Sequence, residues 1–195
     1  MDISLSQTIT EEQYDSKSIR ESRVMPRDVS INESSMRQAD LDPMLISERD
    51  ARKIVVKQYK TDILNVIRND TYESGFVSQS EYYISNNATE ANYEYIREAS
   101  NELYLEYYND SQVLTGLLIM MGTLSYEEAE PQGQTMALGL LQHEDISVRD
   151  RAIQAFERWN SKKGLPVLRS LHCDRSWLQR YVEKVIAYLE RDGVD

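Results

Sequence analysis

The last third of the chain carries one apolar pattern twice, with the two copies 30 residues apart. In each copy the apolar residues are spaced three and four positions apart, as they are on one face of a helix. The first copy consists of Val148, Ala152, Ala155, Phe156 and Trp159, and the second of Leu178, Val182, Val185, Ile186 and Leu189, with Leu141 and Leu171 as a further equivalent pair. A period of this length is typical of stacked helical hairpins, each of which buries its apolar face only against its neighbours.

The residues around the first copy resemble a known repeat. Residues 145–156 read D-x-x-V-R-x-x-A-x-x-A-F, which is similar to the short bacterial HEAT-like repeat of the PBS-lyase type, with Phe156 where that family usually has Leu. In the second copy Gln179 replaces the expected Arg, and Val182 and Val185 replace the small Ala positions. The resemblance covers residues 131–190 and implies an all-α, HEAT-like solenoid. It implies no particular activity.

The N-terminal residues differ from the rest in composition. Residues 1–46 are rich in Ser, Asp, Glu, Gln and Arg, lack Gly, and contain Pro26 and Pro43. Such a segment buries too little apolar surface to fold alone, so we expect a disordered or extended arm. The alternative is a docking segment around residues 41–46 that becomes ordered on binding. Residues 47–195 then form the helical domain.

Apolar spacing and capping residues predict seven helices and no strand in this domain. Ser47 is the expected N-cap of a helix that ends near Arg68. Further helices are expected over residues 89–108, 111–124 and 131–143, followed by the helices of the two repeats. The helix over 111–124 is apolar nearly all round and should lie in the middle of the core. The polar stretch 69–87 is expected to be a loop or a broken helix.

The charge of the chain is negative and unevenly distributed. The formal net charge is −11, and residues 76–135 alone contain ten acidic residues and one basic residue, a net −9. This field repels nucleic acid and attracts a basic partner. With a single cysteine, Cys173, no apparent secretion signal and no apolar run that could span a membrane, we expect a cytoplasmic protein that does not bind membranes.

Five glutamates recur every four residues and define the glutamate ladder: Glu90, Glu94, Glu98, Glu102 and Glu106. Like charges at this spacing repel each other, whereas glutamate favours helices and such rows are usually solvated faces. The other interpretation is a docking surface for a basic protein, since apolar residues are expected to project among the carboxylates. The predicted partner-binding residues are Glu94, Tyr95, Glu98, Glu102, Leu105, Glu106 and Tyr108.

No catalytic set stands out in the sequence. His143-Glu144 is similar to the His-Glu pairs that hold iron in HEAT-type deoxyhypusine hydroxylases, but the equivalent residues of the next repeat are Cys173-Asp174. We therefore expect no catalytic, cofactor-binding or metal-binding residues. Arg149 is expected to form a structural ion pair with an acidic residue of a neighbouring turn, Asp145 or Asp150.

These patterns predict a non-enzymatic protein–protein interaction module, a small scaffold or adaptor, that binds a basic partner through an acidic, tyrosine-rich helix. One alternative is an immunity or antitoxin protein that neutralises a cationic toxin such as a nuclease. A second alternative is a metal-dependent enzyme built on a HEAT-like scaffold. The sequence leaves the oligomeric state open.

Overall fold

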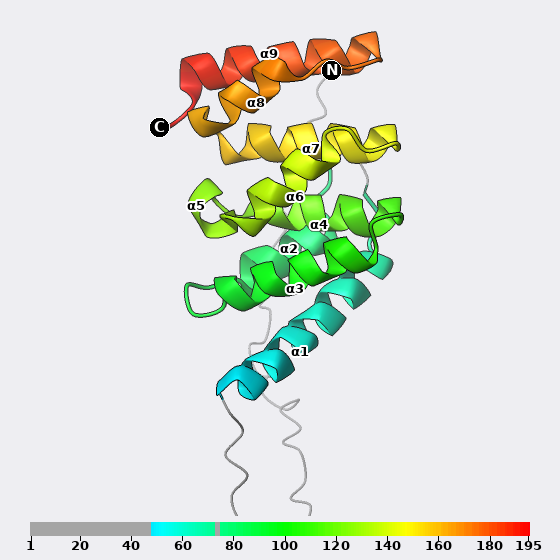
Figure 1. Cartoon of the computed structure of the whole chain (residues 1–195), viewed down its shortest axis with the longest axis vertical. Helices are drawn as coiled ribbons and strands as arrows, with labels where there is room; N and C mark the ends of the chain where they lie inside the picture. Colours follow the sequence, from blue (N-terminus) through cyan, green and yellow to red (C-terminus); the bar gives the residue numbers. More distant parts are fainter. Residues whose placement is uncertain (1–47, 73–74) are drawn as a thin grey trace, which may run out of the picture. The chain divides into compact units, whose positions relative to one another are not determined.

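A computed structural model describes residues 48–72 and 75–195, which all belong to one compact unit and whose regular structure is helical (Figure 1). The helices are α1 (Glu48–Arg68), α2 (Gln79–Asn87), α3 (Tyr93–Glu106), α4 (Ser111–Thr123), α5 (Tyr126–Ala129), α6 (Gln132–Leu140), α7 (Ile146–Trp159), the 3₁₀ helix η1 (Lys162–Gly164), α8 (Leu165–Ser170) and α9 (Ser176–Asp192). The predicted arm over residues 1–46 and the predicted N-cap Ser47 lie outside the described residues. No helix in the described part of the chain has the length and apolar character needed to cross a membrane.

Capping side chains explain where two helices differ from the prediction. The stretch expected to be a loop or a broken helix contains α2, which begins at a capping box: Glu81 N–H donates to the Ser78 hydroxyl, and the Glu81 carboxylate accepts from Ser78 N–H. The helix expected from residue 89 begins four residues later. The Asn92 side chain accepts from Thr89 N–H at 2.7 Å and donates to the Asn87 carbonyl at 2.8 Å, which holds a turn there instead.

The core is centred on α4, as its all-round apolar character predicts. Residues 113–122 of this helix are buried without exception. Two of its glycines permit close helix approaches. A methyl group on Gly116 would lie 2.6 Å from Ile67 Cγ1 of α1, and one on Gly122 would lie 3.3 Å from Ala155 Cα of α7. These two sites bring α1 and α7 against the central helix.

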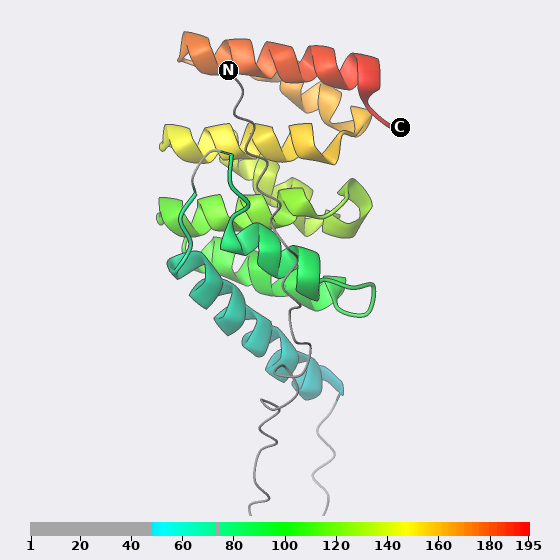
Figure 2. The same ribbon diagram turned by 180° about the vertical axis from the view of Figure 1, so that it is seen from behind.

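The helices pack in series, close to their order in the chain (Figure 1), and the reverse view shows the same succession (Figure 2). Helix α1 packs on α3, α3 on α6, both α4 and α6 on α7, and both α7 and α8 on α9. The predicted apolar faces of the two repeat helices are buried, apart from Ile186, which is half-buried. The Trp159 indole N–H donates to the Met121 carbonyl at 3.0 Å and so ties α7 to α4.

Candidate binding surface

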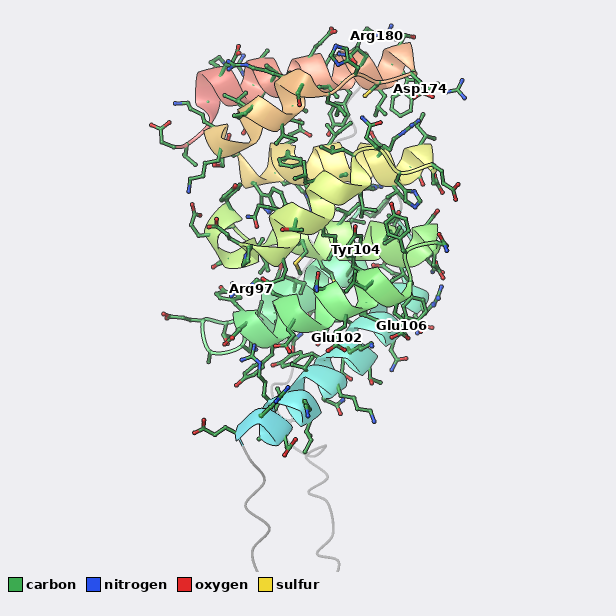
Figure 3. All side chains as sticks on the ribbon, in the orientation of Figure 1. Arg97, Glu102, Tyr104, Glu106, Asp174 and Arg180 are labelled. Carbon is green, nitrogen blue, oxygen red and sulfur yellow. The ribbon has the colours of Figure 1, made fainter. Side chains whose placement is uncertain are left out.

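Four members of the glutamate ladder lie on α3, and basic side chains of α1 contact all four. The Arg52 guanidinium bridges Glu94, at 2.7 Å from Oε1, and Glu98, at 2.8 Å from Oε2. The Lys60 ammonium bridges Glu102, at 3.3 Å, and Glu106, at 2.6 Å. Figure 3 shows Glu102 and Glu106 on the side of α3 that faces α1. The fifth member, Glu90, lies in the turn before the helix.

The charges of the two helices balance. Helix α1 has six basic and three acidic residues, a net +3, whereas α3 has four acidic residues and one basic residue, a net −3. Hydrogen bonds between the helices raise the pKa of Arg52 and Lys60 and lower the pKa of Glu94 and Glu106. The ladder therefore joins α3 to α1. At the contact itself, however, four carboxylates share two cations, so an excess of negative charge remains.

The three apolar members of the predicted surface have different environments. Tyr95 is half-buried, and the Arg52 guanidinium lies over its ring, 5.4 Å from the ring centre. Tyr108 is 42% exposed, but its ring packs edge-on against Tyr104 and His143. Leu105 is 68% exposed. The structure thus places Tyr95 at the contact with α1 and Tyr108 at the contact with the loop after α6, whereas Leu105 projects from α3.

Both histidines lie within hydrogen-bonding distance of backbone groups. His143 is buried; its Nδ1 accepts from Asp145 N–H at 3.1 Å, so its Nε2 carries the proton that is shared with the Tyr108 carbonyl at 3.2 Å. His172 is exposed, with Nδ1 3.0 Å from the Ser170 carbonyl. Within residues 48–72 and 75–195, no three His, Cys, Asp or Glu side chains are grouped so that they could hold a metal ion.

The prediction for the ion pair of Arg149 named the wrong acidic residue. Arg149 Nη2 lies 2.9 Å from Oδ1 of Asp174, in the loop before α9 (Figure 3), whereas Asp145 caps α7 by accepting from Ser147 N–H at 2.8 Å. Asp150 is desolvated, which raises the pKa of its carboxyl. The ion pair of Arg149 therefore links α7 to the loop before α9, and local spacing cannot identify such a partner.

Two hollows flank the segment that leads into α2, and nothing in the sequence analysis singled them out. The Arg151 pocket, about 340 Å³, is lined by Tyr72, Gly75, Phe76, Val77, Ser78, Glu81, Ile119, Arg151, Gln154 and Arg158. The Tyr82 pocket, about 490 Å³, is lined by Val66, Val77, Ser78, Gln79, Tyr82, Tyr83 and Asn87. The signal for them in the sequence is Phe76-Val77, two large apolar residues in a polar stretch.

Comparisons with protein-family models, with curated proteins and with solved structures find no match to this chain. A proposal about function therefore depends on the residues and the geometry described above.

Proposed function

We propose that this chain is a non-enzymatic, HEAT-like helical-repeat module that binds a basic protein through the glutamate ladder and Leu105 of α3. The observation that carries the proposal is the local excess of negative charge at the contact of α3 with α1, where four carboxylates share the two cations of Arg52 and Lys60. The exposed Leu105 lies on the same helix, one residue from Glu106. An apolar side chain surrounded by excess negative charge suits a partner that carries both Lys or Arg and an apolar contact residue.

The order of packing supports the repeat part of the proposal. Equivalent residues of α7 and α9 are buried, such as Val148 with Leu178 and Ala152 with Val182, and the two helices pack against each other. The Arg149–Asp174 ion pair links these consecutive repeats. A solenoid is built in this way, since each repeat is stabilised by its neighbour. Binding of a cationic toxin would be a special case of the same interaction.

The test must separate binding by α3 from the contact that α3 makes with α1. Reversing the charge of Glu94, Glu98 and Glu102 would also remove both ion pairs of Arg52 and one of the two of Lys60, so a loss of binding would be ambiguous. We suggest Leu105→Lys, which changes an exposed side chain, with Leu138→Lys on α6 as the matched control, because Leu138 is also exposed.

The measurement is capture of proteins from a native lysate at two salt concentrations by the wild type and both variants. The proposal expects a basic protein that the wild type and Leu138→Lys retain, and that raised salt or Leu105→Lys releases. If Leu105→Lys retains the same protein as tightly as the wild type, the glutamate ladder and Leu105 are not the binding surface.

A further inference from the structure

The two most exposed large apolar residues of the described chain, Val77 and Phe76, lie just before α2, and a third exposed one, Tyr82, lies within it. Phe76 is 75% exposed, Val77 78% and Tyr82 66%. Isolated exposed apolar residues are ordinary, but three large ones within seven residues form a patch of the kind that contacts other proteins. This patch lies outside the surface proposed above for a basic partner.

The backbone beneath the patch is firmly held. Asp70 is buried, and its two carboxylate oxygens accept from Gln79 N–H at 3.0 Å and from Ser80 N–H at 2.7 Å. Ser78 and Glu81 cap each other in the same turn. Tyr82 is thus presented to solvent from a capped helix start, with Val77 directly before the cap, which lowers the entropy that is lost when a partner binds.

The two hollows meet at Val77 and Ser78 and differ in character. The Arg151 pocket contains two guanidinium groups and one carboxylate. The Arg158 guanidinium forms an ion pair with Glu81. The Tyr82 pocket is lined by apolar, aromatic and amide side chains and contains no charged group.

Of the two guanidinium groups in the pocket, that of Arg151 forms no ion pair with a described residue, although Glu81 and Asp150 lie near enough to interact with its charge. Its guanidinium donates to the Gln154 side-chain oxygen at 2.6 Å, and no carboxylate in residues 48–72 or 75–195 forms an ion pair with it. The side chain is half-buried, so part of its hydration is lost. A guanidinium in this situation binds carboxylates well, since its planar donors match the two oxygens.

We propose that the two pockets together bind a peptide segment that carries a carboxylate close to an apolar side chain. The carboxylate pairs with Arg151, and the apolar side chain enters the Tyr82 pocket across Val77. The complementary charge is opposite to that expected on α3, so this surface takes an acidic segment, not a basic one. The carboxylate comes from an acidic side chain or from a chain terminus.

Fluorescence anisotropy with labelled synthetic peptides and the full chain tests this inference. One probe is Gly-Leu-Ser-Glu-Gly with an amidated end, which offers a side-chain carboxylate. The other is Gly-Ser-Gly-Leu with a free end, which offers a terminal carboxylate. Their controls replace Glu by Gln and the free end by an amide. We expect at least one probe to bind about tenfold more tightly than its control, the ratio typical of one charge-assisted hydrogen bond.

Three variants locate the binding. Arg151→Gln should weaken the preferred probe about tenfold, and Val77→Ser should weaken it several-fold because the apolar contact is reduced. Arg180→Gln on α9, an exposed residue labelled in Figure 3, removes the same charge elsewhere and should leave the affinity unchanged. Circular dichroism of each variant checks that it folds.

The proposal is overturned if neither probe binds more tightly than its control. It is also overturned if Arg151→Gln and Arg180→Gln weaken binding equally. Because Leu105 plays no part in this test and Arg151 none in the lysate test, either proposal can fail alone.

Discussion

Replacing Gly116 by Ala tests how closely α1 is seated on the central helix α4. The added methyl carbon would lie 2.6 Å and 2.7 Å from the two γ-carbons of Ile67, and it would also meet the Tyr72 hydroxyl. Ile67 is completely buried, so it has little room to move. Overpacking of this kind costs about 1–3 kcal/mol, whereas Gly→Ala in a helix stabilises by about 1 kcal/mol. Because the added carbon would meet three atoms closer than 3.0 Å, we take the upper part of the overpacking range, about 2–3 kcal/mol, and expect a net loss of about 1–2 kcal/mol in the free energy of unfolding.

Gly139→Ala in α6 is the matched control, because its methyl carbon would meet a single movable group. That group is the Tyr104 hydroxyl, 2.7 Å away at the end of a half-buried side chain that can swing aside. Here helix propensity should prevail, so the variant should be as stable as the wild type or slightly more stable. Urea unfolding followed by circular dichroism measures both changes. Equal stability of Gly116→Ala and wild type, or an equal loss in both variants, would refute the close approach of α1 to α4.

Three further measurements probe other contacts. Lys60→Met should lower stability at pH 7, and the difference from wild type should disappear as the pH falls through the depressed pKa of Glu106, since a carboxyl with a lowered pKa loses its contribution on protonation; a difference that stays constant down to pH 3 would contradict this. A double-mutant cycle with Arg149→Met and Asp174→Asn should give a coupling free energy of about 0.2–1 kcal/mol by urea unfolding, and zero coupling would show that the ion pair does not stabilise the contact of α7 with the loop before α9. The Cys173 thiol, whose pKa is raised by burial, should react with a disulfide reagent more slowly in the folded chain than in urea, and equal rates would contradict its half-buried position.

The apolar faces of the helices were the most predictable part of the fold. The spacing of apolar residues along a helix is a local pattern, so the sequence alone predicts that Val148, Ala152 and Leu178 are buried. All three are buried in the structure. Helix ends were less predictable because side chains decide them. Ser78 and Glu81 form a capping box that the sequence contains, whereas the Asn92 turn depends on hydrogen bonds to residues on both sides of it.

The environment of the glutamate ladder could not be predicted from its spacing. Spacing places Glu98 and Glu102 on one helix, but it does not say which element of the fold lies beside them. Their partners, Arg52 and Lys60, precede them by more than 40 residues, and only the packing of α1 on α3 brings them together. The net +3 charge of residues 48–68 was the available signal. This positive charge predicts a partner for the ladder only when it is compared with the net −3 charge of α3.

The pairing of α1 with α3 also constrains how a basic partner can bind. A partner that displaced Arg52 or Lys60 would have to break ion pairs that α1 already makes. The new ion pairs would only replace the lost ones, so the free energy of binding would gain little. A partner that adds a third cation meets pairs of carboxylates in which two negative charges share one positive charge. It is therefore attracted without breaking the ion pairs between α1 and α3. At the α1–α3 contact the charge to be neutralised is two, because four carboxylates face two cations. Because the attraction depends on this excess of negative charge, raised salt should release a basic partner from α3, and the apolar contact at Leu105 should supply the rest of the affinity.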